Sequence, residues 1–119
     1  MIFALLLALN APCSDYSTTA EISECMVRHV KIKDLEVELQ RQQSLAEIDL
    51  LGLPAAQQAA LKDALQKSQT KWLSYRDAQC EFVAISYENG SGRGIAVASC
   101  LVDLNDARIE QLRKFSKEL

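Results

Sequence analysis

The chain has 119 residues, of which 49% are hydrophobic, and its formal net charge is −3. That length fits a single domain with a core of useful size. The sequence lacks a basic stripe with interleaved aromatic residues, so we expect no nucleic-acid partner. It also lacks the alternation of apolar and polar residues typical of strands, which predicts an all-α protein.

The N-terminal residues 2–9 form a continuous apolar run, followed by a short Asn-Ala-Pro segment. A bilayer span needs about 20 residues, so this run is too short to cross a membrane. It fits the apolar core of a secretory signal with a cleavage region near Ala11, although no Lys or Arg precedes it; a buried helical turn is the alternative. We expect residues 1–12 to be a signal-peptide-like segment without a stable membrane anchor, and residues 13–119 to be the domain.

A first helix is predicted to begin after Thr18, because Thr18 and Glu21 have the spacing of a capping box. It should run to about Leu51, since Gly52 favours a left-handed helix end and Pro54 the start of the next helix. Its apolar residues recur mostly at steps of three or four, as in a core-facing stripe. They are Ile22, Met26, Val30, Ile32, Leu35, Leu39, Leu45 and Ile48.

Two further helices are predicted, over residues 55–87 and 95–117, from apolar residues at helical spacing. These residues are Leu61, Leu65, Trp72, Tyr75, Phe82 and Val83, then Val97, Leu101, Leu104, Ile109, Leu112 and Phe115. Three glycines within residues 90–94 predict a loop between the helices. The fold class is therefore an all-α antiparallel bundle of three helices, or of four if the first breaks near Lys33 and Asp34. Helices of thirty residues would reach ~45 Å, which favours a break or a bend.

Four cysteines, Cys13, Cys25, Cys80 and Cys100, occur without a C-x-x-C pair. This pattern favours two disulfides in an oxidising compartment over a metal or redox site, with free buried thiols as the alternative. Four cysteines allow three pairings. We predict Cys13 with Cys25, across the start of the first helix, and Cys80 with Cys100, across the antiparallel hairpin that the glycine loop closes.

Residue patterns typical of catalysis are absent from the sequence. His29 is the single histidine, and no acid or nucleophile has a fixed spacing to it. The glycines at 90, 92 and 94 follow no strand and have the wrong spacing for a dinucleotide loop. Acidic pairs such as Asp103 and Asp106 fit solvated helix charge. We predict a non-enzyme without catalytic residues, metal ligands or cofactors.

Trp72 and Arg76 are four residues apart, so the guanidinium can stack on the indole from the same helix face. Arg108 lies eight residues after Cys100, on the disulfide side of the last helix. We expect Arg76, Asp77 and Arg108 to lock the hairpin through stacking and an ion pair. Direct contact with a ligand is the alternative.

Together these residues resemble the LprI-like lysozyme-inhibitor domain, a family of small secreted bacterial proteins, over about residues 13–115. The resemblance rests on Cys25, Gln69-x-x-Trp72-x-x-Tyr75-Arg76-Asp77-x-x-Cys80, Tyr87-x-x-Gly90-Ser91 and Cys100-Leu101-x-x-Leu104-x-x-x-Arg108-x-x-x-Leu112. It implies an all-α domain with two disulfides, a periplasmic or secreted location and, for some members, lysozyme inhibition. It also implies a structural motif formed by Trp72, Tyr75, Arg76, Asp77 and Arg108.

Two functions are compatible with this resemblance. A lysozyme inhibitor of net negative charge would be steered toward basic lysozymes, whose cleft holds two carboxylates. The candidate contacts are Arg93 with a cleft carboxylate, Ser91 through a hydrogen bond and Glu88 with a cation at the rim. The alternative is a non-enzymatic envelope module, such as an immunity protein, an adaptor or a structural domain, whose loop is a plain helix connection.

Overall fold

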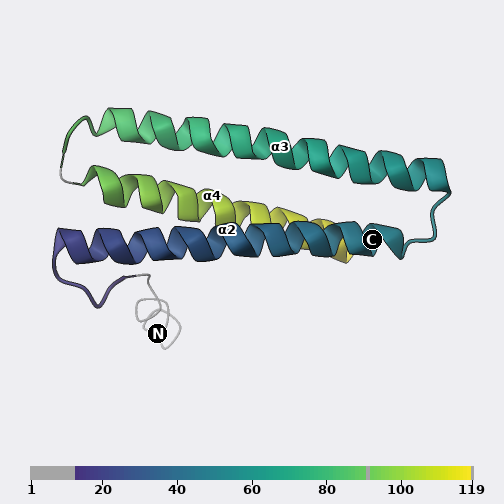
Figure 1. Cartoon of the computed structure of the whole chain (residues 1–119), viewed down its shortest axis with the longest axis horizontal. Coiled ribbons are helices and arrows are strands. Elements are labelled where there is room, and N and C mark those ends of the chain that lie inside the picture. The colour runs from purple at the N-terminus through teal and green to yellow at the C-terminus, as the bar shows by residue number, and fades with distance from the viewer. Residues whose placement is uncertain (1–12, 91, 119) are drawn as a thin grey trace.

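Three long helices form the bundle in the computed structural model, which describes residues 13–90 and 92–118. Helix α2 spans Thr19–Asp49, α3 spans Ala55–Ser86 and α4 spans Arg93–Glu118. Successive helices run antiparallel; α4 lies between α2 and α3 near the glycine loop and then crosses behind α2 (Figure 1). The predicted all-α bundle is confirmed, with three helices. The predicted signal-like segment lies outside the described residues.

The helix ends follow the local sequence. The backbone N–H of Glu21 donates to Thr18 Oγ1 over 3.2 Å, so Thr18 caps α2 as predicted. Gly52 has φ +67°, the left-handed conformation that glycine adopts without Cβ strain. Helix α4 begins at Arg93, two residues earlier than predicted, so part of the glycine-rich segment forms its first turn.

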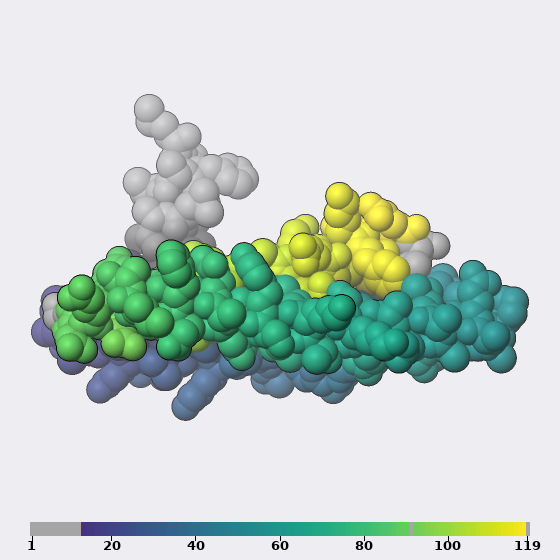
Figure 2. All heavy atoms as spheres, turned by 90° about the horizontal axis from the view of Figure 1, so that it is seen from above, coloured from purple at the N-terminus to yellow at the C-terminus, as the bar shows by residue number. Residues whose placement is uncertain are grey.

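Helix α2 continues through Lys33 and Asp34, so the predicted break is wrong. Lys33 Nζ lies 2.9 Å from Asp106 Oδ1 of α4, and Asp34 Oδ1 lies 2.9 Å from Arg76 Nη1 of α3. These ion pairs tie the middle of α2 to both other helices, and neither residue is a strong helix breaker. The bundle is therefore elongated, and α2 and the C-terminal part of α4 emerge on opposite sides of α3 (Figure 2).

The core forms mainly where α2 packs on α4, whereas α2 contacts α3 least. Met26 of α2 and Ala98 and Val102 of α4 form a buried apolar cluster. Cys13 and Ile22 pack against this cluster, close to the N-terminal end of α2. The loop-proximal half of the core is thus built from small and medium-sized side chains.

The apolar stripe predicted for α2 is partly wrong. Ile32, Leu35 and Leu39 are 51%, 60% and 54% exposed, and Tyr75 and Phe82 of α3 are exposed as well. Ile48 is buried as predicted. Residues outside the predicted stripes are buried too, and three of them are polar: Val37, Gln40 and Ser44 in α2, and Gln69, Cys80 and Ala84 in α3. Buried polar groups need hydrogen-bond partners, and Ser44 and Gln69 find theirs in Ser116 and Arg108 of α4.

Candidate functional site

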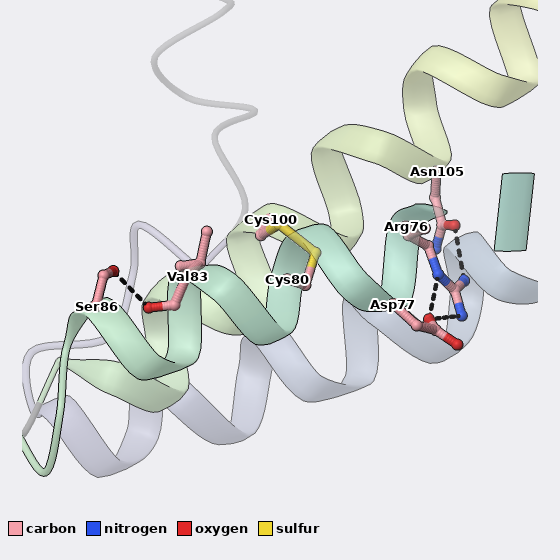
Figure 3. Close-up of a disulfide and its surroundings, with 7 residues drawn as sticks. All are labelled: Arg76, Asp77, Cys80, Val83, Ser86, Cys100 and Asn105. Atoms are coloured by element: carbon pink, nitrogen blue, oxygen red, sulfur yellow. Dashed lines mark hydrogen bonds and ion pairs between the residues drawn. A yellow bond between two sulfur atoms is a disulfide. The ribbon is translucent and has the colours of Figure 1, made fainter. Parts of the chain in front are cut away.

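Two disulfides hold the loop-proximal end of the bundle. Cys13 is bonded to Cys25, and Cys80 of α3 is bonded to Cys100 of α4 (Figure 3). The Cα atoms are 5.7 Å apart in each pair, an ordinary disulfide spacing. The predicted pairing is confirmed, and the second bond fixes the hairpin that carries the glycine loop.

His29 lies beside the N-terminal disulfide. Its ring and the sulfurs of Cys13 and Cys25 bring three potential ligand atoms within 4.8 Å of one another. The two sulfurs are bonded to each other, so neither is the free thiolate that binds a metal ion. In this structure the histidine is therefore a neighbour of a structural disulfide.

Arg76 joins all three helices through one guanidinium. Its Nη1 donates to Asp34 Oδ1 of α2 over 2.9 Å and to Asn105 Oδ1 of α4 over 3.0 Å. Its Nη2 lies 2.9 Å from Asp77 Oδ1, and Figure 3 shows this arrangement on α3. Asn105 is fully buried and donates its Nδ2 to Asp34 over 2.8 Å. The arginine charge is thus paired and hydrogen-bonded, which offsets the cost of its desolvation.

Trp72 contacts two guanidinium groups. The Cζ atoms of Arg76 and Arg108 lie 5.4 and 5.8 Å from the centre of its ring, within the range of cation–π attraction. Arg108 is 7% exposed, and its Nε donates to Gln69 Oε1 over 2.9 Å. Burial lowers the pKa of Arg108, since desolvation disfavours the charged form. We call Asp34, Gln69, Trp72, Arg76, Asn105 and Arg108 the polar lock.

The polar lock is larger than the cluster predicted from the sequence. Arg76 and Arg108 do connect α3 with α4, whereas Asp77 contacts only Arg76 of its own helix. Asp34 and Asn105, which sequence reasoning missed, extend the lock to α2. The sequence pattern could have pointed to Asn105, because this polar residue lies on the buried stripe of α4 and therefore requires a hydrogen-bond partner. Tyr75 is exposed and lies outside the lock, so its structural role stays a prediction.

The loop between α3 and α4 brings Glu88 and Arg93 together in a tight turn. Glu88 has φ +50°, and its carbonyl accepts a hydrogen bond from Arg93 Nη1 over 2.8 Å. A Cβ at Gly90 would lie 3.1 Å from the Tyr87 carbonyl oxygen, so the turn favours glycine there. Ser91 lies outside the described residues. The partner-binding role of these residues stays a prediction.

An apolar hollow of about 480 Å³, which we call the loop-end groove, lies beside this turn. Helix α4 supplies most of its lining, and α2 and α3 supply the rest. A Cβ at Gly94 would lie 3.1 Å from Ser23 Oγ, so glycine permits α4 to approach α2 closely here. The groove is lined by Val27, Val30, Ala84, Arg93, Gly94, Val97, Ala98 and Leu101.

These features define a class of protein: a small three-helix bundle fastened by two disulfides and a polar lock. Within residues 13–90 and 92–118, no helix has the length and apolar character needed to cross a membrane. The sequence matches the family described as "Lysozyme inhibitor LprI" over residues 10–112. The chain therefore belongs to the LprI family.

A curated relative is "Uncharacterized protein R02472" from Rhizobium meliloti (strain 1021). It is 36% identical over 66 residues, which are 56% of this chain and 47% of that protein. The matched segment thus spans about half the length of that relative. No solved structure matches this chain.

Proposed function

We propose that this chain is a secreted or periplasmic binding protein that inhibits a lysozyme of a host or a competitor. The observation that carries the proposal is the match to the lysozyme-inhibitor family over residues 10–112, a range that contains the four cysteines and the polar lock of this chain. The net charge of −3 supports encounter with basic lysozymes. The disulfides support an oxidising compartment, where such bonds persist.

Inhibition would use the turn that carries Glu88, Ser91 and Arg93. Arg93 uses one N–H group on the Glu88 carbonyl, and a guanidinium has further donors for a carboxylate in a lysozyme cleft. The Cys80–Cys100 bond holds the turn in place, which lowers the entropy lost on binding. An occupied cleft excludes the polysaccharide substrate, so this mode of inhibition needs no catalytic residue.

The test is a cell-wall clearing assay with the purified protein in molar excess over several lysozyme types. We expect the wild type to slow clearing and Arg93→Ala to inhibit at least tenfold less well, the scale of a lost charge-assisted contact. Arg113→Ala, an exposed arginine near the end of α4, is the matched control and should inhibit like the wild type. If the wild type slows no lysozyme, the proposal is wrong. If Arg93→Ala inhibits as well as the wild type, lysozyme does not bind through Arg93 of this turn.

A second candidate is a non-enzymatic envelope module that binds another protein. It is favoured by the exposed apolar side chains of Ile32, Leu35 and Leu39, whose spacing places them on one face of α2. Such a stripe is typical of a helix that docks against a partner helix. A pull-down with wild type and Leu35→Lys separates the two candidates. The envelope module requires a protein that binds the wild type but not Leu35→Lys. Added lysozyme should not displace that protein.

A further inference from the structure

The α2–α3 pair is closed at one end and open at the other. Toward the turn that joins these helices, Arg41 Nη1 donates to Gln66 Oε1 over 3.0 Å. Toward the α3–α4 loop, Val27 of α2 and Ala84 of α3 both line the loop-end groove. The α2–α3 contact is the weakest of the three helix pairs, and the hollow lies at its α3–α4 loop end.

Small side chains create the hollow. Ala84 and Ala98 are 6% and 3% exposed, so they belong to the buried wall, yet each offers only a methyl group. Val27 at the rim is 46% exposed. Apolar surface left in water is unfavourable, and an apolar group from a partner would recover free energy by covering it. A volume of about 480 Å³ lies within the usual range of ligand-sized pockets.

One cation lines this apolar hollow. Arg93 is exposed, and among the described residues its guanidinium forms no ion pair with a carboxylate. Arg41 and Arg76, by contrast, are paired with Glu38 and Asp34. An unpaired guanidinium presents several donors in one plane, an arrangement that matches the two oxygens of a carboxylate.

We infer that the loop-end groove is a docking site for an apolar side chain that stands beside a carboxylate on the protein partner. The apolar side chain fills the hollow between Val27 and Ala84, and the carboxylate binds Arg93. The inference rests on the proposed function in taking that partner to be a lysozyme. Continuity with the turn of Glu88 and Arg93 favours a protein partner, because both surfaces can then be covered in one contact.

A second hollow of about 690 Å³ near the same loop is also mostly apolar, but it carries an acidic residue and no cation. Ser86, Ser99 and Asp103 are among its lining residues, and its lining includes no Lys or Arg. The Asp103 carboxylate would repel the acidic group that Arg93 attracts. The loop-end groove is therefore the better match for an apolar group with an adjacent negative charge.

The first experiment tests the groove without a protein partner. The probe is anilinonaphthalene sulfonate, an apolar ring system with one negative charge whose fluorescence rises in apolar sites. We expect the folded wild type to bind it, and Val27→Glu and Arg93→Ala to bind it at least fivefold less tightly. Val27→Lys should retain more binding than Val27→Glu, because its charge attracts the probe. Leu50→Glu, an 84% exposed position at the opposite end of α2, is the control and should bind like the wild type.

Thermal unfolding of each variant confirms that it is folded before titration. If the wild type does not bind the probe, the proposed docking site is wrong, regardless of whether the protein inhibits lysozyme. Equal binding by Val27→Glu and wild type overturns it as well, since the probe must then sit elsewhere.

The second experiment measures the affinity of the same variants for lysozyme. We expect Val27→Glu to bind at least tenfold less tightly than wild type and Leu50→Glu to bind equally well. If wild type and Val27→Glu inhibit lysozyme equally, docking in the groove is wrong and the proposed function stands. If wild type binds the probe but no lysozyme, the proposed function and the lysozyme assignment fail together, and the chemistry of the groove is still supported.

Discussion

The two ends of the bundle are held together by different means. The loop end has two disulfides, small core side chains and an open apolar groove. The middle has the polar lock, and the opposite end has surface pairs such as Asp49 with Lys62. The difference teaches that covalent bonds allow the loop end to leave apolar surface uncovered, because its geometry does not depend on burying that surface. Elsewhere, polar contacts between helices must set their register.

Removal of the Cys80–Cys100 bond should have the largest effect on this comparison. The bond spans a sequence separation of 20, and replacing both cysteines with serine should lower the free energy of unfolding by about 3 kcal/mol. Denaturant unfolding without reductant measures the loss. The matched variant lacking Cys13–Cys25, with a separation of 12, should lose slightly less. Unchanged stability without Cys80–Cys100 would show that the polar lock alone fixes the hairpin.

Asn105→Leu tests the polar lock where it joins all three helices. The amide is fully buried and contacts both Arg76 and Asp34, so its removal leaves these groups with fewer partners. We expect a loss of about 2 kcal/mol in the free energy of unfolding. Glu110→Leu, at an exposed position of α4, is the control and should change stability by less than about 0.5 kcal/mol. Equal effects of the two substitutions would contradict a stabilising role for Asn105.

Arg108→Lys tests the contribution of the guanidinium shape at unchanged charge. A lysine cannot stack on Trp72 and bind Gln69 and Ser68 in the same way, because it lacks the planar fork. We expect a loss of roughly 1–2 kcal/mol, measured by urea unfolding. Arg113→Lys, an exposed neighbour on α4, should be close to neutral. A neutral Arg108→Lys would mean that charge, rather than the fork, matters at this position.

The smallest effect is expected at the surface pairs toward the α2–α3 turn. Hydrogen bonds from Arg41 and then Gln42 hold the pKa of Glu38 below its ordinary value of 4.5. Those from Lys62 and Gln58 hold the pKa of Asp49 below 3.8. A carboxyl with a lowered pKa in the folded state contributes stability above its unfolded pKa, and this contribution is lost as the pH falls through the folded value.

Glu38→Gln should therefore lower stability by roughly 0.5 kcal/mol near pH 6, since both partners are partly exposed and screened by solvent. At an acidic pH below the lowered pKa of Glu38 the variant and the wild type should converge, because the glutamate is then protonated as well. Urea midpoints at the two pH values measure the difference. A difference that is the same at both would assign the effect to packing instead of charge.

Local sequence signals predicted the helix ends and the disulfides well. Thr18 and Gly52 set the limits of α2 through hydrogen bonding and backbone conformation, which depend on near neighbours along the chain. The antiparallel hairpin follows from the glycine loop, and it places Cys80 opposite Cys100. The Trp72–Arg76 contact follows from a spacing of four residues. Each of these features needs little knowledge of how the helices pack.

Features that depend on the third helix could not be predicted in this way. Leu35 and Leu39 have the spacing of a core stripe, yet they are exposed because α2 turns Gln40 and Ser44 toward the interior. Ser44 Oγ lies 3.4 Å from Ser116 Oγ of α4, a contact between residues far apart in the chain. The loop-end groove likewise depends on where three helices place their small residues, which periodicity within a single helix does not reveal.

The position of Trp72 gives the bundle an internal optical reporter. It is the single tryptophan of the chain, and two guanidinium groups lie near its ring in the middle of the polar lock. Its emission should therefore follow the registration of α3 against α4 during unfolding. Because Trp72 does not line the loop-end groove, partner docking there should leave its spectrum largely unchanged. Folding and binding can thus be followed separately in the unlabelled protein.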